Sequence, residues 1–149
     1  MRPGFKDPRV HYAVNCASLG CPNLMARAWR AETLEPDLDA AARAYVNHPR
    51  GVAALPSGAL RVSSIYRWFA EDFGGDDDGL RAHLRTHAAP PLARIIDGAP
   101  AIAEHGYDWS LNRALGVPGG SRPSRTTSTG PSIPATSIPR LAAATARGT

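Results

Sequence analysis

Residues 5–24 read FKDPRVHYAVNCASLGCPNL and contain both cysteines of the chain, Cys16 and Cys21, together with His11. No other stretch gathers as many reactive side-chain types. Residues 9–15 alternate polar and apolar side chains and include β-branched and aromatic residues, a pattern that predicts a strand. We therefore place any functional site at the end of this expected strand.

The strand prediction has two consequences for the fold. Alternate side chains of a strand point to opposite faces, so His11 is expected to face a second layer, a pocket or solvent. The strand also begins close to Met1 with no earlier strand to pair with, and an unpaired strand leaves backbone polar groups open. We therefore expect an N-terminally truncated domain whose leading part lies upstream.

Residues 16–24 collect serine, glycine, proline and asparagine around the two cysteines, which predicts a loop. The cysteines fit three roles: a short loop disulfide, two buried thiols, or a nucleophile at Cys16. A zinc site is disfavoured, because no second cysteine pair is present. We expect no metal and no cofactor.

The region up to residue 117 mixes helix and strand patterns, so the fold class is α+β with a small mixed sheet and packed helices. A helix that follows Ser63 or Ser64 should place Ile65, Trp68, Phe69 and Phe73 in the core. The other expected elements are a helix from about Thr33 or Glu35 to Asn47, a β-hairpin over 50–63, a helix over 78–87 capped by an aspartate, a short helix around 92–96 and an extended segment over 101–112. His83 and His87 share one helix face, which we interpret as solvated.

The net charge of +4 is confined to the end of the chain. Residues 1–117 hold 13 basic and 13 acidic residues, whereas 118–149 hold four arginines and no acid. Scattered arginines make a poor phosphate-binding surface, so no nucleic-acid partner is expected. Residues 118–149 are rich in serine, threonine, proline and glycine, which predicts a disordered tail.

No apolar run is long enough for a membrane span, and the first residues do not form a secretory signal. As written, the chain is expected in the cytoplasm. A signal peptide upstream of Met1 would change this expectation to a periplasmic or secreted protein.

Three ordered blocks of sequence resemble the downstream part of the domain-of-unknown-function family 547 (DUF547). They are residues 7–18 followed by Cys21-Pro22, residues 62–69 followed by Asp72-Phe73, and residues 107–112. The resemblance spans roughly residues 5–112. The upstream family motif of the type Trp-Ile-Asn-x-Tyr-Asn-Ala is missing here, which again implies a truncated domain.

The resemblance carries no settled activity, but it bears on the site. Many bacterial members look exported, which favours a Cys16–Cys21 disulfide. A distant similarity to papain- or transglutaminase-like folds implies a triad with His11 as base, Asp108 orienting it, and Cys16 or an upstream residue as nucleophile. Our first hypothesis is a binding or structural domain of an exported protein, with a small molecule or a protein as ligand. The alternative is a thiol- or histidine-dependent hydrolase or acyl transferase.

Overall fold

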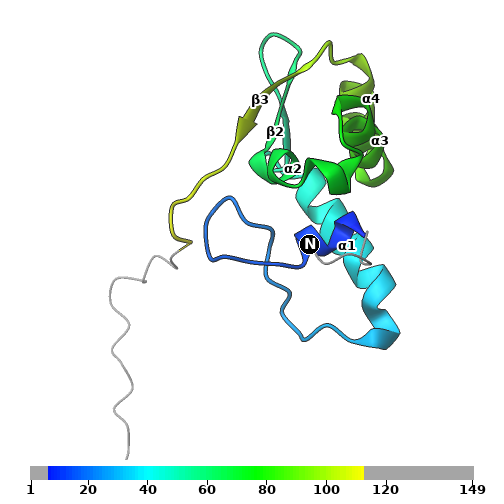
Figure 1. Cartoon of the computed structure of the whole chain (residues 1–149), viewed down its shortest axis with the longest axis vertical. Coiled ribbons are helices and arrows are strands. Elements are labelled where there is room, and N and C mark those ends of the chain that lie inside the picture. The colour runs from blue at the N-terminus through cyan, green and yellow to red at the C-terminus, as the bar shows by residue number, and fades with distance from the viewer. Residues whose placement is uncertain (1–6, 113–149) are drawn as a thin grey trace, which may run out of the picture. The chain divides into compact units, whose positions relative to one another are not determined.

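The computed structural model describes residues 7–112, which form an α+β fold (Figure 1). Within this range, four α-helices and three short 3₁₀ helices accompany a three-stranded sheet. The elements in chain order are η1 (Pro8–Tyr12), η2 (Ala31–Thr33), α1 (Leu34–Val46), β1 (Val52–Ala54), β2 (Leu60–Ser63), α2 (Ser64–Trp68), η3 (Ala70–Phe73), α3 (Asp77–His87), α4 (Pro90–Gly98) and β3 (Ile102–Gly106). The α+β fold class is confirmed.

The segment expected as the opening strand is the 3₁₀ helix η1, so the strand prediction over 9–15 is wrong. Asp7 caps this helix by accepting the Arg9 N–H at 2.9 Å, and a proline occupies its first turn. The Arg9 guanidinium also binds Glu35 at 2.7 Å and Asp39 at 2.9 Å, which fastens η1 to α1. Capping and long-range ion pairs outweigh the alternating pattern. The unpaired-strand argument for truncation therefore does not hold.

Helix α1 follows the predicted bounds closely, because its start and its apolar spacing are both explicit in the sequence. Pro36 lies in the first turn, where its missing N–H costs no hydrogen bond. Asp37 accepts hydrogen bonds from Arg27 at 2.6 Å and Thr33 at 2.8 Å. Leu38 and Tyr45 are buried on the inner face.

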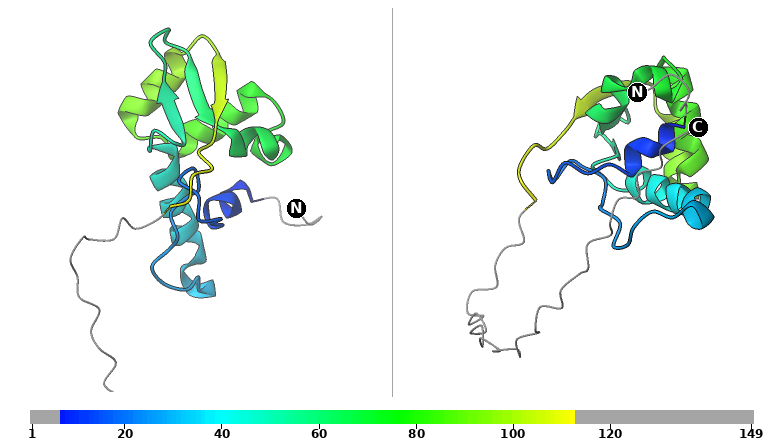
Figure 2. Two further views of the ribbon diagram at one scale, coloured as in Figure 1. Left: turned by 90° about the vertical axis from the view of Figure 1, so that its left-hand side faces the viewer. Right: turned by 60° about the horizontal axis from the view of Figure 1, so that its bottom comes forward.

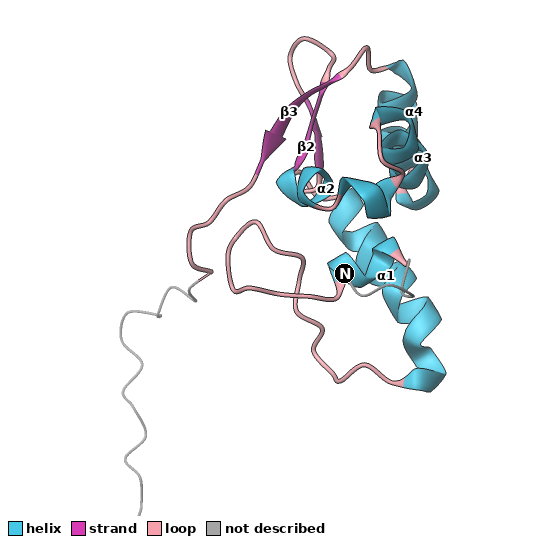
Figure 3. Ribbon diagram, in the orientation of Figure 1, coloured by secondary structure: helices cyan, strands magenta, loops and turns pink. Residues whose placement is uncertain are grey.

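The sheet is mixed, with the order β1-β2-β3. Strands β1 and β2 form the predicted antiparallel hairpin, and β2 pairs with β3 in parallel. A parallel pair needs a long crossover, and here α2, η3, α3 and α4 supply it (Figure 3). The expected extended segment over 101–112 is regular only as far as Gly106.

The aromatic helix after β2 differs from the prediction. Ser63 caps it as expected by accepting the Ile65 N–H, but the α-helix ends at Trp68 and continues as η3. The change from α to 3₁₀ geometry rotates the apolar stripe, so Phe73 is buried whereas Trp68 is 48% exposed and Phe69 is 41% exposed. The aromatic cluster therefore belongs partly to the surface.

The core lies between the sheet, α1 and the pair α3 and α4, which lie side by side (Figure 1). Asp76 caps α3 by accepting the Gly79 N–H at 2.8 Å, and Leu80 and Leu84 point inward as predicted. The largest fully buried side chains are Tyr12, Tyr45, Tyr66, Phe73, Leu60, Leu84 and Ile96. Three of these side chains are tyrosines, so three hydroxyl groups lie within the core.

Among residues 7–112, no helix is both long and apolar enough to cross a bilayer. The predicted disordered tail, residues 118–149, lies outside the described residues.

Candidate functional site

Cys16 and Cys21 are joined as a disulfide, with Cα atoms 6.3 Å apart, in the usual range for such a bond. The disulfide prediction is confirmed. Asn15 shapes the turn into this loop: its side-chain oxygen accepts the Ala17 N–H and its amide donates to the Pro22 carbonyl, both at 2.7 Å. Since only a thiolate can act as a nucleophile, Cys16 in the disulfide form is not one.

The disulfide loop lies beside the segment that follows β3 (Figure 2), and backbone hydrogen bonds join the two. Three backbone hydrogen bonds of 2.8 Å make this pairing: Leu19 N–H to Ser110 O, Gly20 N–H to Asp108 O, and Asn112 N–H to Ala17 O. A side chain at Gly20 would place its Cβ 2.8 Å from the Asp108 nitrogen, so only glycine allows this approach.

The Tyr107 side chain reinforces the same pairing. Its hydroxyl lies 3.0 Å from the Cys21 sulfur and 3.2 Å from the Cys16 sulfur, and it accepts a hydrogen bond from Ser18 at 3.0 Å. The Tyr45 hydroxyl donates to the Gly20 carbonyl at 2.7 Å, and burial raises the pKa of Tyr45 to about 12. Two tyrosines from distant parts of the chain, Tyr45 and Tyr107, thus bind the loop.

Next to this pairing the surface is hollowed by an open groove of about 940 Å³. We call it the arginine groove, and its lining residues are Leu19, Gly20, His48, Pro49, Arg50, Arg61, Val62, Gly106, Tyr107, Asp108, Trp109, Ser110 and Asn112. The lining combines the disulfide loop, the turn after α1, the ends of β2 and β3, and the segment after β3. Its volume lies within the range of small-molecule sites, roughly 300–1,000 Å³.

Two arginines, Arg50 and Arg61, line this groove. Arg50 lies over the Tyr45 ring, with its Cζ 5.6 Å from the ring centroid, and donates to the Asn23 side chain at 2.5 Å. Its Nε atom is buried without a hydrogen-bond partner among the described residues. Arg61 is exposed, and its side chain runs past Gly106. Neither arginine has an ion-pair partner within residues 7–112.

The acidic side chain of the groove, Asp108, is already engaged. It accepts the Ser110 backbone N–H at 2.8 Å, and hydrogen bonding to Ser110 lowers the pKa of Asp108 below its usual value. It is therefore a carboxylate at neutral pH with a local partner. The net charge of the groove lining remains positive.

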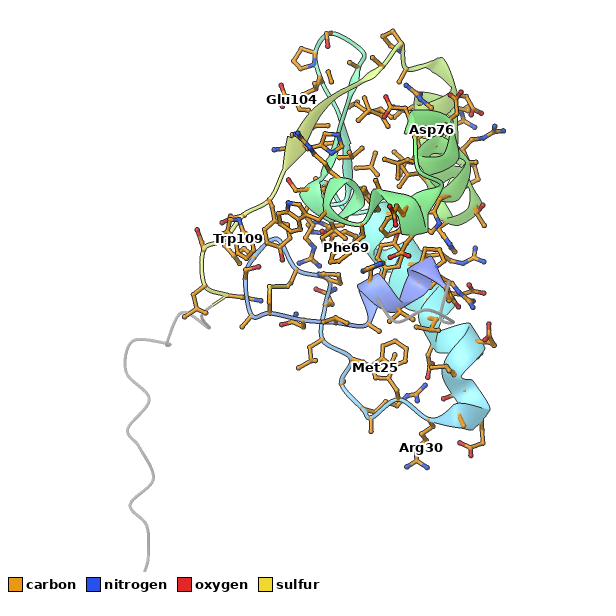
Figure 4. All side chains as sticks on the ribbon, in the orientation of Figure 1. Met25, Arg30, Phe69, Asp76, Glu104 and Trp109 are labelled. Atoms are coloured by element: carbon orange, nitrogen blue, oxygen red, sulfur yellow. A yellow bond between two sulfur atoms is a disulfide. The ribbon has the colours of Figure 1, made fainter. Side chains whose placement is uncertain are left out.

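An aromatic cluster stands at the rim, where Figure 4 shows Trp109 on the segment after β3, beside the disulfide loop. The ring centroids of Tyr107 and Trp109 are 4.7 Å apart, and those of Trp68 and Trp109 are 5.5 Å apart. Trp109 is nevertheless 68% exposed. A large apolar ring held in place yet open to solvent is a common mark of a binding surface.

His11 lies elsewhere, in η1, and its partner is Asp72 rather than Asp108. Its Nε2 atom is 2.9 Å from the Asp72 carboxylate, and its ring stacks on Phe69 with centroids 4.2 Å apart. The Cys16 sulfur contacts the Ser18 and Tyr107 hydroxyls. The three residues expected as a triad therefore have different partners: His11 contacts Asp72, Asp108 contacts Ser110, and Cys16 is bonded to Cys21.

Residues 2–46 match the family model described as "Protein of unknown function, DUF547". The DUF547 resemblance is confirmed for this segment, which includes η1, the disulfide loop and α1. The match stops before the second and third resembling blocks, at 62–69 and 107–112. No curated protein and no solved structure matches the chain.

The sequence did not identify Asp72 as the partner of His11, nor Arg50 and Arg61 as residues of the groove. Asp72 lies in the second block resembling DUF547, and that position was the available signal for a partner of His11. Arg50 and Arg61 carried no signal, because nothing local connects two arginines eleven positions apart.

The His83–His87 face is also different from the solvated one expected. His87 is buried, and His83 Nε2 lies 2.7 Å from the Tyr12 hydroxyl. Burial lowers the pKa of His83 to about 4, and burial likewise lowers the pKa of His87. Within residues 7–112, no three histidine, cysteine or acidic side chains gather as a metal site.

Proposed function

We propose that this domain is a binding module that holds an anionic ligand in the arginine groove. The observation that carries the proposal is the presence of two guanidinium groups, Arg50 and Arg61, beside a single carboxylate that is already hydrogen-bonded. By contrast, Arg9, Arg27 and Arg85 each pair with an acid. Guanidinium groups bind carboxylates and phosphates through paired N–H donors, so the groove suits an anion.

The disulfide supports a place for this module in an exported protein. Disulfides persist in oxidising compartments such as the periplasm and are rare in the cytoplasm. The Cys16–Cys21 bond also stiffens the loop that forms one wall of the groove. Because this wall is already ordered, less conformational entropy is lost when a ligand binds.

A catalytic role has one observation in its favour, the hydrogen bond between His11 and Asp72. A carboxylate that orients a histidine is part of nucleophile–base arrangements. The nucleophile expected for it, Cys16, is bonded to Cys21 and contacts Tyr107 instead. Binding therefore has the stronger support.

The proposal can be tested by nuclear magnetic resonance titration of the oxidised protein with citrate and with pyrophosphate. We expect shifts to concentrate at the Arg61 side-chain N–H and the Trp109 indole N–H. Arg61→Gln should weaken binding about three- to tenfold, since a charge-assisted hydrogen bond at an exposed site contributes roughly 0.6–1.4 kcal/mol.

Arg94→Gln is the matched control, because it removes the same charge from an exposed position on α4, outside the groove lining. It should leave the affinity unchanged. Equal weakening in the two variants, or chemical-shift changes spread evenly over the protein, would show an effect of net charge. Either result would refute the proposal that the anion binds in the arginine groove.

A further inference from the structure

We infer that the ligand of the arginine groove is an acidic oligosaccharide, with one sugar ring stacked on Trp109 and a carboxylate bound by Arg61. This inference rests on the proposed anion-binding function and names its ligand class. Three independent features of the groove support it: the aromatic rim, the polar side chains beside the rim, and the charge.

The side chains of the aromatic rim pack against one another, and Tyr107 contacts the disulfide. Trp109 packs against Tyr107 and Trp68, and the Tyr107 hydroxyl is fixed on the disulfide and Ser18. The indole therefore keeps its orientation while 68% of its surface stays exposed. The C–H face of a sugar ring is an apolar surface flat enough to pack on such an indole, and its hydroxyls remain free at the edge.

The polar part of the lining favours hydroxyl groups over a peptide backbone. The backbone carbonyls of Asp108 and Ser110 and the N–H of Asn112 are used by the disulfide loop. A peptide could not pair with these groups as an added strand. Asp108, Ser110 and Asn112 belong to the same lining, and their side chains are of types that donate and accept hydrogen bonds, as vicinal hydroxyls require.

The charge of the lining selects acidic over neutral sugars. Arg50 and Arg61 lie in the groove without an acidic partner among the described residues, and His48 lines the same hollow. The groove is partly open to solvent, so a ligand longer than the groove can extend beyond it. An open positive groove with an aromatic rim suits a chain that carries repeated carboxylates.

The test compares three tetramers: α-1,4-linked tetragalacturonate, neutral maltotetraose and tetraglutamate. Binding to the oxidised full chain is followed by calorimetry and by tryptophan fluorescence. We expect tetragalacturonate to bind at least about tenfold more tightly than either of the others, because only it offers both a stacking ring and a charge.

Variants at the rim separate stacking from charge. Trp109→Ala should weaken tetragalacturonate binding at least about tenfold, whereas Trp109→Phe keeps an aromatic face and should retain most of it. Trp29→Phe is the control, since Trp29 lies outside the groove lining. Circular dichroism and the thermal midpoint must match the parent protein. If Trp109→Ala does not fold, Trp109→Leu is the test, because it keeps an apolar side chain but has no aromatic face and should weaken binding in the same way.

The outcomes distinguish this inference from the proposed function. If tetraglutamate binds as well as tetragalacturonate and Trp109→Ala has no effect, the carbohydrate class is overturned while anion binding stands. If maltotetraose binds as well as tetragalacturonate, the requirement for acidic sugar is overturned. If citrate, pyrophosphate and all three tetramers fail to bind, both the inference and the proposed function fall.

Discussion

Acid should destabilise this fold mainly through His83, between pH 6.5 and pH 4, and buried His87 acts in the same direction. Its ring lies against Phe73, with centroids 4.9 Å apart, and its Nε2 atom is 2.7 Å from the Tyr12 hydroxyl. Burial is the main cause that lowers the pKa of His83 to about 4, and the neighbouring His87 acts in the same direction, while Asp7 opposes them. The folded state therefore holds this imidazole neutral.

The sign of the effect follows from proton binding. In the unfolded chain the pKa of His83 returns to 6.5, so between pH 6.5 and about pH 4 the unfolded state binds the extra proton. The stability that neutral His83 contributes is complete above pH 6.5 and is lost as the pH falls through this window. Below about pH 4 both states are protonated and the loss stops growing.

The magnitude follows from the two pKa values. The difference between 6.5 and about 4, at about 1.4 kcal/mol for each pH unit, corresponds to about 3 kcal/mol before solvent screening. His83 is only partly buried, and solvent screening reduces this figure, so we expect about 2 kcal/mol. That is a large part of the stability of a domain of this size.

The assay is urea unfolding followed by circular dichroism at pH values from 7 to 4, for the parent protein and for His83→Gln. Glutamine can still bond the Tyr12 hydroxyl but does not titrate, so the variant should lose about 2 kcal/mol less over this range. His105→Gln is the control, because His105 is exposed on β3. Parallel pH curves for the parent protein and His83→Gln would refute the reasoning.

Three further changes test the packing and the site. Replacing both cysteines by serine should lower the free energy of unfolding by roughly 2 kcal/mol, because the disulfide closes a loop of only about six residues. Urea titration measures this loss, and no change would mean that backbone pairing alone holds the loop. Phe73→Ala should cost about 3–5 kcal/mol in the same assay, since Phe73 is fully buried, and a loss under 1 kcal/mol would contradict its place in the core. Gly20→Ala should cost about 1–3 kcal/mol and should increase hydrogen exchange at the Gly20 amide, because the new Cβ would meet the Asp108 backbone; unchanged exchange would refute this contact.

The elements that the sequence predicted well are those with local signals. Helix α1 has a proline in its first turn and apolar residues at helical spacing, and α3 has an aspartate cap. The β1–β2 hairpin has Pro56-Ser57-Gly58 between its strands, and Gly58 takes the positive φ of 81° that favours glycine. Each of these signals acts between residues a few positions apart, so it persists whatever the rest of the chain does.

The same alternation that predicted a strand at 9–15 was overruled by contacts with distant residues. Arg9 binds Glu35 and Asp39, which are 26 and 30 positions away, and these bonds hold η1 against α1. The partner of His11, Asp72, is 61 positions away, and nothing in the sequence separates it from the expected partner Asp108. Periodicity carries no information about such choices.

The amino-acid sequence by itself determined the α+β class, the main helices and the hairpin, and it put both cysteines in one loop with a spacing that a disulfide can bridge. Only the tertiary structure decided that Asp72 faces His11, that Tyr107 rests on the disulfide 86 positions away from Cys21, and that Arg50 and Arg61 share a groove with Trp109. The physical reason is that interactions between neighbouring residues stabilise caps and turns. A groove, by contrast, exists only where packing has brought separate segments together.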